Sequence, residues 1–398
     1  MKSCGGLEDT GTGGKKDKNF KGVKEIKLPC LKGALSRGLL RKLAPKKTQF
    51  AAVDIGSKEI KIVEISTTDG SPVVTAFGRI ATPADVLGDP VDEEALVNAL
   101  NNVVLTSGIQ TKEVIATVSG DRVITRHIKV PTMPDKELET AIKFEAEKFI
   151  PIPVNELIIR YLNLGEIESG GEKNLHLLLV AVSTSFIYDY YGIFARAGLI
   201  VAAIDLQSLC LWRVFSGLST YAALEGTVGI LDIGASTTQF LVVCDRSLQF
   251  TRTLPVGGNL LTRSLAEHYG FDFEEAQRIK EEEGGLLSSE EASISVASGA
   301  MQMDFSLRDG LSELVREIRR SLDYYAAQEN ATAIKRFIIS GGTSKLKGFR
   351  AFFAEAMEAP VDFGNPIVPA LPGDGQGPFP YDPAFSVVLG AALREVVE

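Results

Sequence analysis

Two short apolar runs near the middle of the chain flank a small polar turn. The runs occupy residues 228–231 and 240–243, and both are rich in β-branched residues. This pattern predicts two strands of a hairpin. The turn between them begins with a carboxylate and continues with small side chains, in the order Asp232, Gly234, Ala235, Ser236 and Thr237.

A turn of this composition suits a phosphate group. Small side chains let backbone N–H groups approach phosphate oxygens closely, and a carboxylate at the entry can hold a metal ion through water. A single Asp-Gly turn is more often plain hairpin chemistry, because Asp and Gly are ordinary turn residues. The interpretation therefore depends on further evidence.

A second copy of the pattern near the start of the chain supplies that evidence. An apolar run at 51–53 leads into Asp54, Gly56 and Ser57, and another run follows at 60–65. The two aspartates lie roughly half a chain length apart. This duplication predicts two related α/β domains that face each other across a nucleotide, with Asp54 and Asp232 beside a hydrated Mg²⁺.

Composition is typical of a soluble globular protein. The chain has 398 residues, 45% hydrophobic and 23% charged, which is enough for two or more domains with proper cores. No apolar run approaches the roughly 18 residues of a membrane span, and no signal peptide is evident. Its four scattered cysteines suggest a reducing cytoplasm, and its three histidines lack metal-like spacing.

Charge is distributed unevenly along the chain. Residues 1–49 hold 13 Lys and Arg against 4 Asp and Glu, and we predict a basic, disordered tail there. Leucines at near-helical spacing from 28 to 43 leave open a basic amphipathic helix on an anionic membrane or a partner. The remaining chain is acidic, which argues against nucleic acid as the main partner.

A further helix is predicted over 135–149. Asp135 is expected to cap its start, and the helix is expected to end before Pro151. Phe144 lies about 100° or more from the apolar face, so it is either an anchor for a partner or a contact with the neighbouring lobe. The residues on the predicted buried face are Leu138, Ala141, Ile142, Glu145 and Phe149.

The duplicated turns resemble the phosphate motifs of the actin-like ATPase superfamily. Three later stretches match that superfamily in the same order: 201–208, a Gly-Gly turn at 341–342, and a small-residue helix at 385–393. The resemblance implies a two-lobed α/β fold, a duplicated ribonuclease-H-like architecture that binds ATP and Mg²⁺. It assigns nucleotide contacts to Asp54, Gly56, Ser57, Lys58, Lys61, Asp232, Gly234, Ala235, Ser236, Thr237, Gly257, Gly258, Gln277, Lys280, Gly341, Gly342 and Lys345.

Several of these positions differ from the superfamily pattern. Lys58 stands where a small residue is usual, and Gln277 with Lys280 replaces an acid–lysine pair that holds ribose hydroxyls. Lys61 is alternatively a solvated strand lysine. Gln207 takes the place of a Glu that positions the attacking water, so the resemblance implies at most slow hydrolysis, because Gln is a poor base. The alternative for Gln207 is a buried helix N-terminus.

The stretch 131–153 reads PTMPDKELETAIKFEAEKFIPIP. It closely resembles an inserted subdomain of the PilM family of type IV pilus assembly proteins, which also occurs in looser form in the division protein FtsA. The resemblance implies a cytoplasmic ATP-binding scaffold, peripheral at the inner membrane, in a pilus or related secretion machine. It also implies that the N-terminal cytoplasmic peptide of PilN binds in a groove beside the insert, at or near Phe144, and that assembly ATPases and platform proteins are further partners.

Two alternatives remain at this point, a self-polymerising FtsA-like filament protein and, behind it, a small-molecule kinase. Sedimentation with ATP would support the filament, and phosphoryl transfer to a sugar would support the kinase. The predicted organisation is a tail at 1–49, a first lobe at 50–112 with 190–224 and 375–398, an FtsA/PilM-type insert at 113–189, and a second lobe at 225–374 with a helical subdomain at about 259–325.

Overall fold

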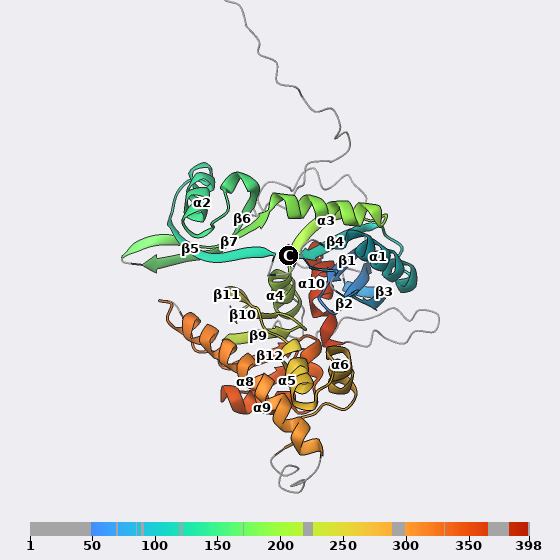
Figure 1. Ribbon diagram of the computed structural model, residues 1–398. Helices are drawn as coiled ribbons and strands as arrows, with labels where there is room; N and C mark the ends of the chain where they lie inside the picture. The colour runs from blue at the N-terminus through green and yellow to red at the C-terminus, as the bar shows by residue number, and fades with distance from the viewer. Residues whose placement is uncertain are drawn as a thin grey trace, which may run out of the picture.

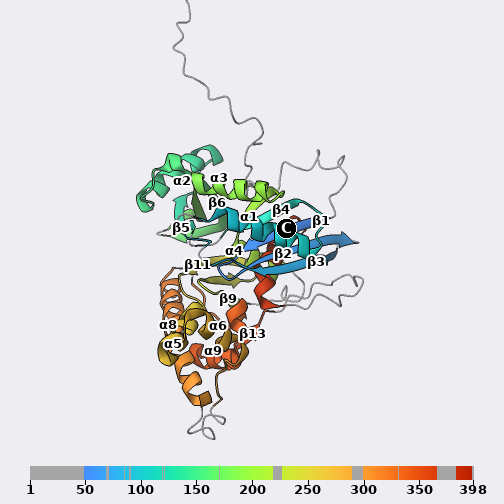
Figure 2. The same cartoon turned by 45° about the vertical axis from the view of Figure 1, so that its right-hand side comes forward.

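The structure is a computed structural model that describes residues 49–396, except 69–70, 85, 89–90, 119, 121, 170, 218–225, 289–298, 330 and 365–381. The predictions for the basic tail therefore lie outside the described residues. Two lobes and an inserted unit make up the molecule, with the insert beside the first lobe and away from α5, α6 and α9 of the second lobe (Figures 1 and 2).

The first lobe is built on a five-stranded mixed sheet in the order β3-β2-β1-β4-β8. Alternate side chains of β1 enter two different cores. Ala51, Val53 and Ile55 pack under α1 and α3, whereas Ala52 faces the centre of the molecule. The elements are β1 (Gln49–Ile55), β2 (Glu59–Thr68), β3 (Ser71–Ala81), α1 (Glu93–Ser107), β4 (Glu113–Val118), α3 (Thr184–Arg196) and β8 (Ile200–Leu206).

The second lobe repeats this plan with a sheet in the order β11-β10-β9-β12-β13. Leu231, Ile233 and Phe240 point into a core with the helices on the outer face. Its strands are β9 (Thr227–Ile233), β10 (Thr238–Cys244), β11 (Ser247–Leu254), β12 (Arg336–Ser340) and β13 (Val361–Phe363). Its helices are α5 (Asn259–Tyr269), α6 (Phe273–Glu282), α8 (Gly299–Ala326), the short η2 (Gly342–Lys345) and α9 (Phe349–Met357).

The duplication inferred from sequence is therefore present in the topology. Each sheet begins with a three-stranded antiparallel meander and adds two parallel strands beside the first strand of the meander. Both predicted hairpins are confirmed, β1 with β2 and β9 with β10. The predicted two-lobed α/β fold agrees with this arrangement.

Two helices lie between the sheets and share one core with both lobes (Figure 1). They are α4 (Gln207–Gly217) and α10 (Ser386–Ala392), the latter preceded and followed by the short turns η3 (Pro383–Phe385) and η4 (Leu393–Glu395). A Cβ at Gly390 would lie 2.0 Å from the backbone oxygen of Cys210, so a larger residue at 390 would push the helices apart. The small residues of the stretch 385–393 therefore permit this close approach.

The inserted unit is a three-stranded antiparallel sheet, ordered β5-β7-β6, with one helix packed on it. Its elements are β5 (Val123–Pro131), α2 (Asp135–Phe149), η1 (Val154–Glu156), β6 (Leu157–Ser169) and β7 (Glu172–Ser183). The strand β4, at the start of the stretch assigned to the insert from sequence, pairs with β1 in the first sheet. The three-stranded unit therefore begins after β4.

Two details predicted for α2 are wrong. Asp135 is the first helical residue rather than the cap, which is Pro134, and the carbonyl of Pro134 accepts hydrogen bonds from the amides of Glu137 and Leu138. Phe149 is 53% exposed instead of buried. The helix ends at Phe149, and Ile150, in extended conformation just beyond it, fills the core instead.

Candidate functional site

The two predicted phosphate turns face one cleft between the lobes. Each turn is closed by a backbone hydrogen bond, from Gly56 to Glu59 at 3.0 Å in the first and from Gly234 to Thr237 at 2.9 Å in the second. The cleft has a volume of about 970 Å³, and both turns contribute to its walls. The structure thus brings together two segments that are far apart in sequence.

Asp54, at the end of β1, is held by two hydrogen-bond donors and one cation from three other elements. Its Oδ1 accepts hydrogen bonds from Thr117 Oγ1 at 2.5 Å and Gln207 Nε2 at 3.0 Å. Lys61 Nζ lies 3.8 Å from its Oδ2. Lys61 is buried, so the alternative of a solvated strand lysine is wrong. This carboxylate is fixed in position and paired with a cation.

Asp232, its counterpart in the second lobe, has fewer partners. The residue is half-buried, and its buried Oδ1 has no hydrogen-bond partner within the described part of the chain. The pKa of Asp232 is raised to about 7, mainly by burial and in smaller part by the charge of Asp54, while a hydrogen bond from Ser340 and the charge of Lys61 oppose the rise. A buried carboxylate oxygen without a partner on the cleft wall fits a site for a bound cation or its water.

Gln207 bridges the two lobes at the start of α4. Its amide nitrogen donates to Asp54, and its Oε1 accepts from Gln239 Nε2 at 3.3 Å. Gln239 is itself oriented by Thr253 Oγ1, which donates to its Oε1 at 2.9 Å. The residue is therefore a member of a polar network that spans the cleft floor, in addition to standing at a helix N-terminus.

Glycines let backbone segments approach the second turn closely. A Cβ at Gly257 would lie 2.7 Å from the carbonyl oxygens of both Gly234 and Ala235. The amide of Gly258 and the hydroxyl of Thr343 each donate to the Gly234 carbonyl at 2.9 Å. The predicted residues of the turns at 257–258 and 341–342 thus lie around one phosphate turn.

Lys280 and Gln277 face this turn from α6. Lys280 Nζ donates to three acceptors: the Gly258 carbonyl at 3.0 Å, Thr262 Oγ1 at 2.7 Å and Gln277 Oε1 at 2.8 Å. Burial, and then the charge of Lys58, lower the pKa of Lys280 to about 7. All three ammonium protons have acceptors in the protein, so Lys280 holds the start of α5 against α6.

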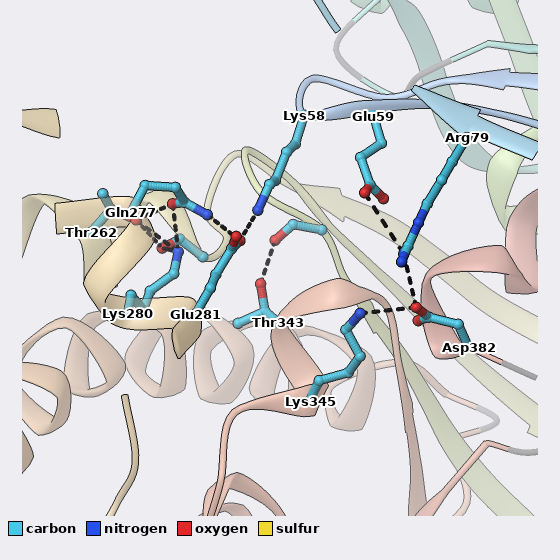
Figure 3. Close-up of polar contacts among 12 residues, drawn as sticks. Lys58, Glu59, Arg79, Thr262, Gln277, Lys280, Glu281, Thr343, Lys345 and Asp382 are labelled. Carbon is cyan, nitrogen blue, oxygen red and sulfur yellow. Dashed lines mark hydrogen bonds and ion pairs between the residues drawn. The ribbon is translucent and has the colours of Figure 1, made fainter. Parts of the chain in front are cut away.

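The remaining predicted cations lie at the mouth of the cleft (Figure 3). Lys58 reaches from the first turn to an ion pair with Glu281 on α6. Lys345, at the end of η2, pairs with Asp382 at 2.9 Å. Every residue assigned to the nucleotide by resemblance therefore lies on the cleft wall or in the turns that support it, with Ser236 accepting from Asn259 Nδ2 at 3.1 Å.

The cleft continues beyond the two turns into an extension between α1 and α3. Its apolar lining residues are Leu87, Val91, Leu96, Phe186, Tyr190 and Ile193, and the charged residues Glu93, Arg122 and Asp189 lie beside them. Tyr190 Oη donates to the Thr117 carbonyl at 2.7 Å, so the extension adjoins the residue that holds Asp54. A groove of this kind suits apolar side chains of a peptide.

Phe144 lies on the outside of α2. Its ring is 61% exposed, and Lys148 Nζ lies 4.9 Å from the ring centroid. The alternative of a contact with the neighbouring lobe does not fit this exposure. Phe149 and Ile152 are also exposed nearby in sequence, so the end of the helix presents apolar surface on more than one side.

Sequence reasoning missed three residues that contact the predicted site residues. Gln239 pairs in register with Asp232 as Lys61 pairs with Asp54, so the duplication itself was a signal that could have found it. Thr117 carried no such signal, since a threonine at the end of a strand is common. Asp382 lies in a stretch of ordinary loop composition, and its role depends on tertiary contacts.

Comparison with known proteins identifies the family. The model for "Type IV pilus assembly protein PilM" matches residues 52–394. The chain belongs to this family. The PilM family assignment covers both lobes and the insert, and it confirms the resemblance found in the sequence around α2.

Similar proteins support the fold of this PilM family member. A structure titled "PilM-PilN type IV pilus biogenesis complex" is 24% identical, with a TM-score of 0.74 over 89% of this chain and all of that chain. The ethanolamine utilization protein EutJ from Carboxydothermus hydrogenoformans is 17% identical, with a TM-score of 0.50 over 88% of this chain and 91% of that one. The cell division protein FtsA of Bacillus subtilis is 19% identical over 80% of this chain and 78% of its own length.

Two features are absent from the described residues. None of the helices there combines the length and apolar character needed to cross a bilayer. Nor do those residues contain a cluster of three His, Cys, Asp or Glu side chains placed to hold a metal directly.

Proposed function

We propose that this PilM family member is an ATP-binding scaffold of a type IV pilus assembly platform, located on the cytoplasmic side of the inner membrane. The observation that carries the proposal is the pair of duplicated turns facing one cleft, with a buried carboxylate oxygen, Asp232 Oδ1, that has no partner among the described residues. A protein that had no ligand there would keep a destabilising buried acid without compensation.

The residues of the cleft fit a Mg-nucleotide. Backbone N–H groups of the turns at Gly56 and Gly234 would surround the phosphates, and Lys61 would supply positive charge. Asp54 and Asp232 would hold a hydrated Mg²⁺, which neutralises phosphate charge when bound. The glycine turn at 341–342 would lie against the adenosine.

Turnover of ATP by the isolated protein is expected to be slow. Gln207 can orient a water molecule but cannot accept a proton, and its amide is already engaged by Asp54 and Gln239. ATP would therefore act mainly as a conformational ligand. We expect turnover slower than about one per second, the low end of ordinary enzyme rates, and a steady-state assay giving several per second would contradict this.

The decisive experiment for nucleotide binding is calorimetric titration of ATP with Mg²⁺ into the full chain and into Asp232→Ala. We expect affinity to fall roughly 10- to 100-fold in the variant, the usual cost of removing an outer-sphere partner of a metal. Asp362→Ala is the matched control, because that aspartate lies on β13 and pairs with Arg336 at 3.6 Å, outside the cleft lining. Equal affinities for wild type and Asp232→Ala would disprove this role of the cleft.

The proposed partner is the N-terminal cytoplasmic peptide of a PilN protein, bound beside the insert, with coupling to the assembly ATPases and other platform proteins. The PilM–PilN structure shares this fold, and the chain offers apolar surface near the insert at Phe144 and in the extension beside Phe186. Aromatic anchors often dominate peptide affinity, at about 2 kcal/mol or more each.

Peptide binding is tested by fluorescence anisotropy with a labelled PilN peptide, with and without ATP. The main effect of Phe144→Ala is expected to be weaker peptide binding, with a smaller loss of thermal stability. Phe186→Ala tests the extension independently. Phe305→Ala is the control, since that ring is comparably exposed but lies on α8 of the second lobe. If Phe144→Ala and Phe186→Ala both bind the peptide with wild-type affinity, the peptide does not bind at this face.

A further inference from the structure

The charged residues Lys58 and Glu59 of the first turn both reach other parts of the cleft mouth. They stand where the superfamily resemblance calls for small residues, and neither is required to hold a phosphate with the backbone of the turn. Figure 3 shows where they point. Lys58 crosses from the first lobe to Glu281 on α6 of the second lobe, and Glu59 lies 3.7 Å from Arg79 on β3.

A second set of ion pairs between the lobes starts at Arg79, on the other side of the cleft mouth (Figure 3). Its guanidinium lies 3.0 Å from Asp382 Oδ2, and the same oxygen accepts from Lys345 Nζ at 2.9 Å. Lys345 belongs to the second lobe and Arg79 to the first, so Asp382 joins the lobes through two ion pairs. Asp382 is itself oriented by the amide of Ala384, which donates to its Oδ1 at 2.9 Å.

We propose that these contacts form two ion-pair latches, Lys58–Glu281 and Arg79–Asp382–Lys345, which hold the lobes together across the cleft mouth and slow the exit of nucleotide. The inference rests on the proposed nucleotide binding, because only a ligand in the cleft must pass between the latches. It assigns to Lys58 and Lys345 a role in closure, in place of direct phosphate contact.

The ion pairs of the latches are weak and depend on salt concentration. Lys58 and Glu281 are 41% and 46% exposed, and exposed ion pairs are weak and screened by salt. Each latch is therefore expected to slow release by about two- to fivefold, and the two together by their product if they act independently. Asp382 is less exposed than its partners, so the second latch is the less salt-sensitive of the two.

The competing assignment makes Lys58 a phosphate ligand, and charge exchange separates the two. Under the latch proposal, Lys58→Glu and Glu281→Lys each place like charges opposite one another and accelerate release. The double variant K58E/E281K restores an opposite pair and therefore restores slow release. Under the phosphate assignment the double variant stays impaired, because it leaves a carboxylate beside the phosphates.

The experiment is stopped-flow release of a fluorescent ATP analogue from the full chain, chased with excess ATP, at low and high NaCl. Expected results are faster release in each single variant by about two- to fivefold, recovery in the double variant, and loss of these differences at high salt. Glu274→Lys is the matched control, since it makes the same charge change on the same helix outside the cleft lining. For the second latch, Asp382→Asn is expected to accelerate release to a similar degree.

A measurement without nucleotide separates failure of the latches from failure of the proposed function. Spin labels at Asn101→Cys and Glu267→Cys, exposed positions on α1 and α5, report the distance between the lobes in a background with Cys4, Cys30 and Cys244 replaced by serine. Lys58→Glu should lengthen or broaden that distance, and K58E/E281K should restore it. Unchanged release rates and unchanged distances in all variants would overturn the latch proposal. A wild-type chain that binds no nucleotide would instead overturn the proposed function. In that case the distances would still show whether the ion pairs hold the lobes together.

Discussion

Lys61 and Gln239 occupy equivalent places in the two halves, each paired in register with the aspartate of its own turn. The duplicated turns are therefore not equivalent in charge. Asp54 has a lysine, a threonine and a glutamine around it, whereas Asp232 faces a neutral amide in the same place. These differences leave Asp232 as the acid that burial penalises, and a bound cation would stabilise its charged form.

Asp232 should make the ligand-free protein less stable as pH rises. Its folded pKa, about 7, lies above the unfolded value of 3.8, so the folded state holds a proton that the unfolded state has lost between these values. The contribution of this extra proton to the free energy of unfolding is complete below pH 4 and is lost as pH rises through 7. Asp232→Asn, which cannot ionise, should raise the melting temperature at pH 8 by about 2 °C or more, with the gain shrinking toward pH 5.

Thermal unfolding from pH 5 to 8 checks this, and Asp362→Asn serves as the exposed control. A gain from Asp232→Asn that is the same at every pH would contradict the linkage. Saturating Mg-ATP should reverse the order of the two proteins, because the carboxylate is useful once a cation is bound.

At the scale of elements, patterning predicted the two hairpins and the helix α2, and it was wrong where the chain leaves that helix. Apolar spacing placed Phe149 on the buried face, but Phe149 is the last helical residue and is exposed, and Ile150, in extended conformation just after it, takes the buried place. Residues of the cleft were predictable where a turn repeats, as with Asp54 and Asp232. They were not predictable where partners come from distant elements, as with Thr117 on Asp54 or Asp382 on Lys345.

The turn after β12 provides a test with an internal control. Gly341 has φ of +84°, and a Cβ there would lie 2.4 Å from the Ile233 carbonyl oxygen. Gly341→Ala should therefore destabilise the protein by about 2 kcal/mol or more and weaken ATP binding, through strain and overlap at β9. A Cβ added at the neighbouring Gly342 would meet nothing within 4 Å, so Gly342→Ala should leave stability nearly unchanged. Equal effects in calorimetry would contradict this view of the turn.

At the scale of the whole molecule, the insert touches both lobes. It continues from the first sheet through β4, and His127 on β5 contacts the second lobe. The amide of Thr251 donates to His127 Nε2 at 3.1 Å, which requires the proton to be on Nδ1, directed at His176 Nε2 3.0 Å away. The His127 ring also stacks on Phe250, and Lys129 pairs with Glu329 at 2.5 Å.

This contact should depend on pH in the acidic range. Burial and the charge of His176 lower the pKa of His127 to about 4, so the neutral ring that accepts from Thr251 is kept. Its stabilising contribution is present above pH 6.5 and is lost as pH falls toward 4. His127→Ala should accelerate hydrogen exchange in β11 several-fold at pH 7, with His268→Ala on α5 as control, and unchanged exchange in β11 would show that the insert is held elsewhere.

The placement of α10 has a consequence for synthesis on the ribosome. All seven residues of this helix are buried, and they pack on β1 and β2, which are the first strands of the described chain to be made. The apolar face of that sheet therefore lacks α10 while the insert and the whole second lobe are translated. The first lobe completes its core only after residue 392 has emerged, so a nascent chain of this protein needs protection from aggregation for most of its translation time.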